Sequence, residues 1–232
     1  QDIEFSAINE IHEASSLTSS QEVSKWRGYL STANQPRLKQ IKLAKTLDSN
    51  ESVEQTIIRR GSTRRFSHDS ISFEQLSTIL HESTRGIVSD FEHDIMNDIY
   101  LIINEVDGLG QGSYFYNKSE NSLEILQVGN LRNVSGHLGL DQSLPYDASA
   151  TIFFMVDLEK VLEKFGNRGY RVAQIDASIT AGKMYLAAYG LNIGATGLTF
   201  YDDEVTEFFS PHASNKSVMF MLAVGKKAKN RI

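Results

Sequence analysis

The sequence predicts a domain of the α+β class, on the basis of three apolar segments of strand length and one long apolar helix. The segments 99–103 and 218–224 are continuous apolar runs, the segment 151–156 is mostly apolar, and each of the three has the length of a buried strand. Between the second and third lies the segment 170–191, which is apolar on nearly all sides when wound as a helix. Such a helix is buried in a core or at a subunit interface, and its alanines together with Gly182 permit close helix packing.

A hairpin and two shorter helices complete the predicted domain. Apolar residues at helical spacing predict a helix over residues 52–60. Ser72 and Gln75 form a capping-box pattern that opens a second helix. Residues 112–116 and 123–126 have the pattern and length of paired strands, with a polar turn between them.

Chain size and the polar N-terminal region set the expected domain organisation. The chain has 232 residues, of which 41% are hydrophobic, and this is enough for one large core. Residues 1 to about 50 are polar and irregularly patterned, which predicts an extended arm with short helices. We therefore expect an N-terminal arm over residues 1–51 and one domain over residues 52–232. Because the sequence begins without methionine, a longer natural polypeptide is also possible.

Composition excludes several classes of function. The chain has no cysteine, so disulfides, thiolate nucleophiles and cysteine-ligated metals are excluded, and any redox chemistry must come from a bound cofactor. The six histidines show no close metal-ligand pair, and a metal site is not expected. A net charge of −6 argues against a nucleic-acid binder. No segment has the length and apolar character of a membrane span, so we expect a cytoplasmic protein.

A basic segment stands out against the acidic background. Residues 59–66 read Arg-Arg-Gly-Ser-Thr-Arg-Arg-Phe, directly after the first predicted helix. Guanidinium groups pair with phosphate in a bidentate manner, Gly61 allows close backbone approach, and the Ser62 hydroxyl adds a neutral hydrogen bond. The segment therefore suits an anion, although a solvated basic loop paired with surface carboxylates would have the same composition.

A second glycine-rich segment, 190–197, follows the long helix. Its backbone amides could face a ligand, but glycines of this kind also form helix stops and tight turns. The segment lacks the spacing of a dinucleotide-binding fingerprint, and neither a P-loop nor a Gly-x-Ser-x-Gly elbow occurs in the chain.

These residues resemble the signature of a known family. The run Ile-Ile-Arg-Arg-Gly-Ser-Thr-Arg-Arg-Phe at 57–66, followed after four residues by Ile-Ser-Phe-Glu-Gln-Leu, resembles the opening signature of nitroreductase-family flavoproteins. The segment 106–116 resembles the hairpin of the family's azoline dehydrogenase branch, which matures thiazole- and oxazole-containing peptides of the streptolysin-S and cyanobactin types. The resemblance covers roughly residues 52–227.

The resemblance implies a nitroreductase-like fold, in which helices flank a central, mostly antiparallel sheet and one long helix is buried at the centre. It also implies FMN as the cofactor. Site residues carried over from the family are Arg60, Gly61, Ser62 and Arg64 for the phosphate and ribityl chain, Thr196 and Gly197 for the isoalloxazine ring, and Lys226, Lys229 or Arg231 as candidates to complete the phosphate site.

The sequence departs from the azoline dehydrogenase branch in two places. The branch usually has a Pro-Ser-Ala-Gly-like loop where residues 86–94 are polar and acidic, and Ser89 is the residue that preserves part of a flavin contact there. An adjacent Lys-Tyr pair associated with azoline oxidation is missing, and its nearest counterparts are Lys183 and Tyr185. Lys183, Tyr185 or Tyr201 could act as the catalytic base, and each could equally be a packing or surface residue.

The expected function is FMN-dependent oxidation, with azoline rings of a ribosomal peptide as the expected substrate. One alternative is an NAD(P)H-dependent reductase of nitro or quinone compounds, and another is a non-catalytic scaffold that keeps the fold. The resemblance implies a homodimer, or one half of a tandem pseudo-dimer, that acts on a peptide or small molecule without nucleic acid, membrane or metal as a partner.

Overall fold

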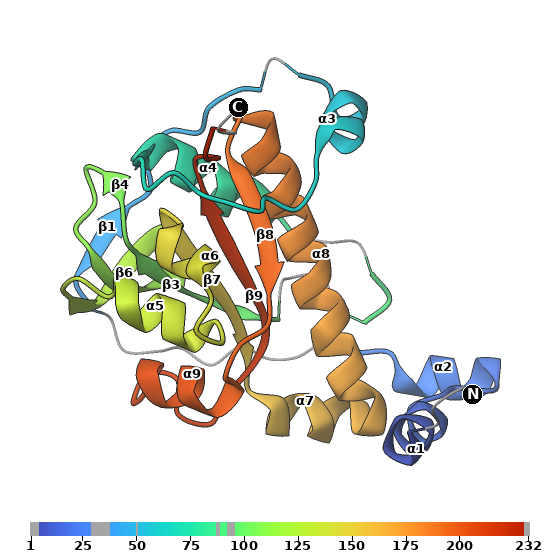
Figure 1. Ribbon diagram of the computed structural model, residues 1–232. Helices are drawn as coiled ribbons and strands as arrows, with labels where there is room; N and C mark the ends of the chain where they lie inside the picture. Colours follow the sequence, from blue (N-terminus) through green and yellow to red (C-terminus); the bar gives the residue numbers. More distant parts are fainter. Residues whose placement is uncertain (1–4, 29–37, 50, 87–88, 92–95, 230–232) are drawn as a thin grey trace.

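The core of the molecule is a seven-stranded sheet in the order β1-β6-β5-β3-β7-β9-β8 (Figure 1). The computed structural model describes residues 5–28, 38–49, 51–86, 89–91 and 96–229. Every neighbouring pair of strands in this sheet is antiparallel. Its strands are β1 (Gln40–Lys42), β3 (Asp98–Ile103), β5 (Gly112–Asn117), β6 (Ser122–Val128), β7 (Ala150–Val156), β8 (Gly194–Leu198) and β9 (Ser217–Gly225), and the short strands β2 (Ile71–Ser72) and β4 (Val106–Asp107) pair separately.

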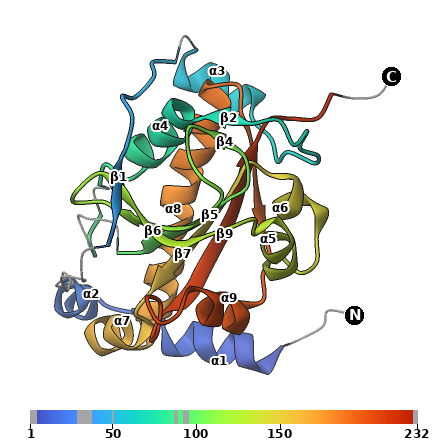
Figure 2. The same cartoon turned by 90° about the vertical axis from the view of Figure 1, so that its left-hand side faces the viewer.

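Helices cover both faces of this sheet (Figures 1 and 2). One face packs against α4, α7 and α8, and the other packs against α5, α6 and α9. The helices are α1 (Ser6–Ala14), α2 (Ser20–Trp26), α3 (Val53–Arg59), α4 (Phe73–Ser83), α5 (Arg132–Leu138), α6 (Ser143–Asp147), α7 (Leu158–Phe165), α8 (Gly169–Gly190) and α9 (Asp202–Phe209), with a 3-10 turn at Gly166–Arg168. In the described part of the chain, no helix is both long enough and apolar enough to cross a membrane.

Successive side chains of a strand point to opposite faces of the sheet, and so one strand can contribute to the hydrophobic clusters on both faces. In β3, Ile99, Leu101 and Ile103 face the α8 side, whereas Tyr100 and Ile102 face the α9 side. All five side chains are fully buried, because successive residues of a strand point to opposite faces and both faces carry helices. The continuous apolar run of the sequence is therefore explained by a strand buried on two sides, as predicted.

The long helix α8 has 22 residues, and ten of them are buried. Its side toward the sheet places Val172, Ala177 and Met184 in the core. The opposite side leaves Tyr170, Ile175 and Ile179 with 46%, 40% and 39% of their surface exposed. The helix is thus central to the fold, and its outer apolar side chains remain partly exposed in the described part of the chain.

The α+β fold expected from the sequence is confirmed, with two additions. The capping box at α4 is present, because the Ser72 hydroxyl accepts the Gln75 N–H at 3.2 Å and the Gln75 side chain accepts the Ser72 N–H at 2.9 Å. The N-terminal arm contains α1 and α2, and it also supplies β1, which adds an edge to the main sheet beside β6. The glycine-rich segment 190–197 ends α8 at Gly190 and turns at 191–192, as expected of a helix stop, but from Gly194 it forms the other edge strand, β8.

Candidate functional site

The basic segment begins where α3 ends. The Arg60 N–H donates to the Thr56 carbonyl at 2.8 Å and closes the helix. Arg59, the preceding residue, binds other parts of the chain: its guanidinium pairs with the Glu51 carboxylate and donates to the Tyr189 carbonyl at 2.6 Å. These contacts fix the end of α3 against the C-terminal end of α8, so the residues that follow start from a defined place.

After α3, the chain runs along the free edge of β8. The outward-facing backbone groups of an edge strand are available to other segments. The Ala195 carbonyl accepts the Thr63 N–H at 2.9 Å, and two residues farther along the edge the Gly197 N–H donates to the Tyr185 hydroxyl at 2.6 Å. Tyr185 projects from α8, and therefore the helix, the edge strand and the basic segment meet here.

Tyr185 contacts the basic segment directly. Its hydroxyl oxygen lies 3.4 Å from the Ser62 hydroxyl oxygen, and the Arg60 guanidinium carbon lies 5.7 Å from the centre of its ring. The structure thus brings together Arg60, Ser62, Tyr185 and Gly197, four of the residues singled out in the sequence. Gly61 lies in the same stretch, and a Cβ added to it would meet no atom within 4 Å. Internal packing therefore does not account for a glycine there.

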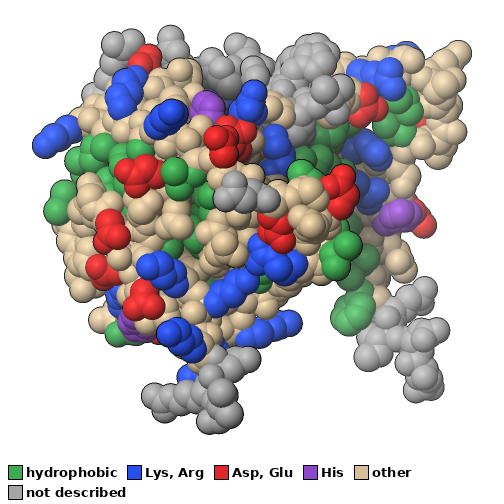
Figure 3. Space-filling view, turned by 90° about the horizontal axis from the view of Figure 1, so that it is seen from above, with side chains coloured by type: hydrophobic (Ala, Val, Ile, Leu, Met, Phe, Trp, Pro, Cys, Tyr) green, Lys and Arg blue, Asp and Glu red, His purple; other side chains and the backbone are tan. Residues whose placement is uncertain are grey.

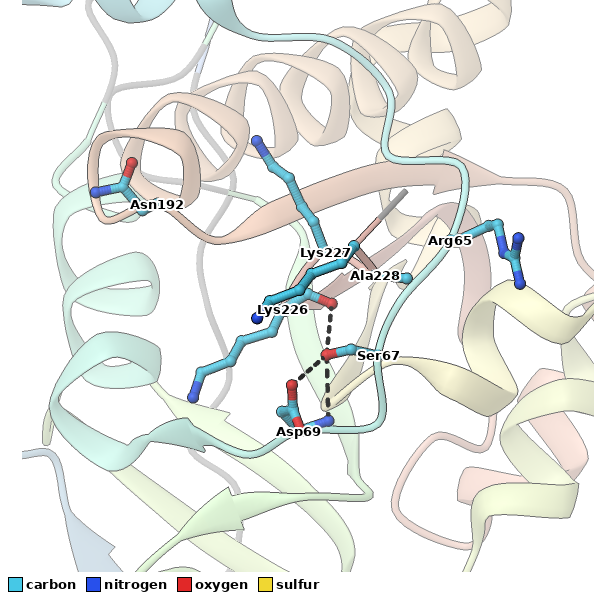
Figure 4. A pocket seen from close by; sticks show the side chains of 8 residues that line it. Arg65, Ser67, Asp69, Asn192, Lys226, Lys227 and Ala228 are labelled. Atoms are coloured by element: carbon cyan, nitrogen blue, oxygen red, sulfur yellow. Dashed lines mark hydrogen bonds between the residues drawn. The ribbon is translucent and has the colours of Figure 1, made fainter. Parts of the chain in front are cut away.

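A cavity of about 570 Å³ lies next to this edge, between the basic segment and the chain that follows β9 (Figure 4). The two segments are joined by backbone bonds from Ser67 N–H to the Lys226 carbonyl and from Ala228 N–H to the Arg65 carbonyl, both at 3.0 Å. The lining residues are Arg65, Ser67, Asp69, Asn192, Lys226, Lys227, Ala228 and Lys229. Four cations and one carboxylate line the cavity, and that carboxylate, Asp69, accepts the Ser67 hydroxyl at 2.7 Å.

Several cations of this region have no carboxylate partner. Among the described residues, none forms an ion pair with Arg60, Arg64, Arg65, Lys226 or Lys229. The face of the molecule seen from above carries many Lys and Arg side chains, with Asp and Glu side chains between them (Figure 3). Lys227 instead places its ammonium nitrogen 3.8 Å from the centre of the Tyr189 ring. In a chain of net charge −6, a group of unpaired cations is suited to an anionic ligand.

Four other residues are expected to contact the cofactor: Thr196, Gly197, Ser89 and Arg231. Thr196 is buried within β8. Gly197 packs on Phe220, since an added Cβ would lie 2.8 Å from the Phe220 ring. Ser89 lies in the short described stretch 89–91, where its hydroxyl accepts the Phe91 N–H at 3.4 Å, and Arg231 lies outside the described residues.

Two of the three candidate bases lie away from the β8 edge. Lys183 is two residues before Tyr185 on α8, which turns it by about 200° around the helix axis. Its ammonium group donates to the Gly86 carbonyl at 3.1 Å, and burial, together with the nearby Arg85 charge, lowers the pKa of Lys183. Tyr201 is the N-cap residue of α9, and its hydroxyl donates to Asp141 at 3.2 Å. Tyr185 is thus the candidate base that the structure places beside the basic segment.

Sequence reasoning missed part of the site. Arg65, Ser67, Asp69, Asn192 and Lys227 line the cavity but were not singled out. Arg65 and Lys227 are next to residues that were, Ser67 and Asp69 lie three and five residues after Arg64, and Asn192 has a positive φ of 60° just after the end of α8. In the described part of the chain, no group of three or more His, Asp or Glu side chains has the arrangement of metal ligands.

Comparisons with known proteins find two relatives whose names describe them as putative nitroreductases. A protein from Methanocaldococcus jannaschii named "Putative nitroreductase MJ1384" is 23% identical over 183 residues, which is 75% of this chain and 91% of that protein. A crystal structure from Anabaena variabilis with the same assignment has a TM-score of 0.83 and 25% identity, and it matches 95% of this chain but 47% of its own. The chain thus spans about half the length of that relative.

A third likeness concerns the fold alone. The Escherichia coli microcin synthetase McbBCD complex, solved with a truncated pro-MccB17 bound, has a TM-score of 0.63 at 16% identity, over 97% of this chain and 93% of that one.

The family model described as the nitroreductase family matches residues 57–226, which include the basic segment, α8 and the β8 edge. With this match over more than half of its length, the chain belongs to the nitroreductase family.

Proposed function

We propose that this chain is an FMN-dependent oxidoreductase. The observation that carries the proposal is the group of unpaired cations beside the free edge of β8. The phosphate of FMN is a dianion with several acceptor oxygens, and guanidinium groups bind such oxygens in pairs. Arg60 and Arg64 supply the charge, the Ser62 hydroxyl supplies a neutral donor, and Gly61 leaves space for close approach.

The cations that follow β9 complete the anion site. Lys226 and Lys229 line the cavity next to the basic segment, and Arg231 is two residues farther along the sequence. Thr196 and Gly197 are assigned to the side of the isoalloxazine ring, since β8 runs past the basic segment at that point. FMN, when bound, supplies the chemistry of accepting two electrons as a hydride. The protein binds and orients it and excludes water from it.

The proposed substrate is an azoline ring in a ribosomal peptide. Its support is the likeness of the 106–116 segment to the azoline dehydrogenase branch, together with the fold shared with the microcin synthetase complex. Removing hydride from a ring carbon requires a base for the accompanying proton. Tyr185 is the candidate with the best position, because its hydroxyl lies between Ser62 and Gly197.

A second candidate function is reduction of nitro or quinone compounds with NAD(P)H. It is favoured by the relatives from Methanocaldococcus jannaschii and Anabaena variabilis, whose names assign them as nitroreductases. Nicotinamide distinguishes the two functions. A nitro or quinone reductase bleaches its bound flavin on addition of NADH or NADPH, whereas an azoline oxidase is reduced by its peptide. A scaffold without catalysis would bind no flavin.

A dimer is the proposed assembly. Tyr170, Ile175 and Ile179 of α8 are exposed, as are Val53 and Ile58 of α3. Both helices lie on the same side of the molecule (Figure 1). Exposed apolar residues along a central helix suit a subunit interface. The alternative is that a second, similar domain of one polypeptide covers this side of the molecule. It is consistent with the Anabaena variabilis relative, of which the match covers 47%.

The test is the visible absorption spectrum of the protein purified without added cofactor, followed by release and identification of the chromophore. FMN near one per chain supports the proposal. A colourless protein that also does not bind added FMN contradicts it and leaves the scaffold function. Arg60→Glu is the matched variant, since reversing one unpaired charge removes the phosphate contact without breaking an ion pair within the described chain.

A further inference from the structure

The backbone of Gly197 is already engaged within the protein. Its N–H donates to the Tyr185 hydroxyl at 2.6 Å, a short distance for such a bond. An N–H forms one good hydrogen bond, so this amide has no donor left for a ligand while the bond exists. The absence of a side chain at Gly197 is explained by the Phe220 ring, which an added Cβ would approach to 2.8 Å. Neither feature of Gly197 therefore needs a ligand to explain it.

The hydroxyl of Tyr185 can still donate a hydrogen bond while it accepts the one from Gly197. A phenol can accept one hydrogen bond and donate another, and an accepted bond polarises the O–H and strengthens it as a donor. Among the described residues, the acceptor nearest to this hydroxyl is the Ser62 hydroxyl at 3.4 Å, a distance at which the hydrogen bond is weak. Ser62 itself is exposed, and Tyr185 is half-buried. The hydroxyl of Tyr185 therefore lies at the border between the protein interior and the basic segment.

We propose that Tyr185 is a flavin-binding residue whose hydroxyl, supported by the Gly197 N–H, is the donor that this edge of the protein offers to FMN. This inference rests on the proposed function and assigns to a side chain on α8 a contact that the family resemblance places on the β8 backbone. It replaces the role of base considered for Tyr185 under the proposed function, because a hydroxyl that donates its hydrogen to the flavin does not also accept a proton from the substrate.

An alternative role for Tyr185 makes the opposite prediction. In this role the Tyr185 hydroxyl accepts the Gly197 N–H only in the absence of FMN, and the flavin takes its place as the acceptor when it binds. Removing the hydroxyl would then free the amide and tighten FMN binding. If Tyr185 is a donor to the flavin, removing its hydroxyl weakens binding. The sign of the change in affinity therefore decides between the two roles.

The experiment compares Tyr185→Phe with Tyr189→Phe. Tyr189 lies one turn farther along α8, and its hydroxyl contacts the basic segment at Thr63, 3.2 Å away. Each variant loses one phenolic oxygen and keeps the ring, so the two differ in the contact to Gly197. Dissociation constants for FMN are measured by fluorescence quenching, and the reduction potential of bound FMN is measured by dye equilibration.

We expect Tyr185→Phe to weaken FMN binding about tenfold, a factor that corresponds to about 1.4 kcal/mol. The reduction potential of bound FMN should become more negative in this variant, because the reduced flavin is electron-rich and loses a hydrogen-bond donor that stabilised it. Tyr189→Phe should change the dissociation constant by less than about threefold. Wild-type protein that binds FMN while Tyr185→Phe binds it equally well or more tightly overturns this inference alone.

A measurement without cofactor adds an independent check. Amide hydrogen exchange at Gly197 should be slow in the wild-type apoprotein and faster in Tyr185→Phe, since the N–H loses its acceptor. Equal exchange in both proteins overturns the supporting bond and the inference with it. A wild-type protein that shows this protection but binds no FMN overturns the proposed function, and the assignment of Tyr185 to a flavin fails with it.

Discussion

Arg59 donates to the Tyr189 carbonyl at 2.6 Å, and this bond joins the end of α3 to the last turn of α8. The neighbouring Arg60 makes no ion pair with any described carboxylate and lies over the Tyr185 ring. Two adjacent residues of one type thus have different roles, one structural and one directed outward. Their sequence context alone does not separate them, because both belong to the same basic run.

The first prediction follows from this pair. Arg60→Ala should weaken FMN binding by about tenfold or more through a lost charge-assisted phosphate contact, with little change in Tm. Arg59→Ala should lower the Tm by about 2–4 °C, since it breaks the α3–α8 connection. Flavin titration and thermal unfolding of both variants measure this. Unchanged flavin affinity in Arg60→Ala would contradict the phosphate assignment.

The second prediction concerns two glycines near the same edge. A Cβ at Gly61 meets open space, whereas a Cβ at Gly194 would lie 2.4 Å from the Thr63 hydroxyl oxygen. Gly61→Ala should leave the Tm within about 1 °C and weaken FMN binding, and Gly194→Ala should lower the Tm by several degrees. Thermal unfolding with flavin titration tests both. Full FMN affinity in Gly61→Ala would show that the ligand does not approach this backbone.

Hydrophobic patterning predicted much of the fold and less of the site. The runs in β3, β7 and β9 were recognised because strands buried on both faces are apolar at every position. The edge strands β1 and β8 were not, since β1 has three residues and the glycines of β8 indicate a turn. Edge strands form through pairing partners that are distant in sequence, and composition does not record those partners.

The site was predictable where one short segment carries it. Arg60 and Ser62 were found because phosphate recognition has a local signature. The separation of Lys183 from Tyr185 follows from helical geometry, since residues two apart point in nearly opposite directions. In contrast, the distance of Tyr201 from the basic segment depends on how α9 packs, and only the tertiary structure shows it.

The third prediction tests the proposed dimer. Ile179→Asp places a charge on the outer side of α8 and should convert a dimer to a monomer in sedimentation velocity, because burying an unpaired carboxylate is unfavourable. Val128→Asp is the matched control: Val128 is 73% exposed but lies at the end of β6, away from α8. A dimer that survives Ile179→Asp would place the interface elsewhere, and a wild-type monomer would favour a tandem protein.

The fourth prediction concerns Asp176, a fully buried carboxyl on α8. One of its oxygens accepts the backbone and side-chain N–H groups of Asn97 at 3.0 and 2.7 Å, while the other has no partner among the described residues. Burial raises the pKa of Asp176, and the Asn97 bonds oppose part of this change. The contact holds the start of β3 against α8.

A raised pKa in the folded state means that the native protein binds the proton more tightly than the unfolded chain does. The contribution of Asp176 to stability is therefore greatest at low pH and falls as the pH rises above its unfolded pKa, by about 1.4 kcal/mol per pH unit until the folded pKa is reached. Asp176→Asn keeps an acceptor for both Asn97 bonds and removes the titration. Urea unfolding at pH 4, 5.5 and 7 should show that the variant gains stability relative to wild type as the pH rises. A difference between the two proteins that stays constant over this range would show that Asp176 has the same pKa in the folded and unfolded states.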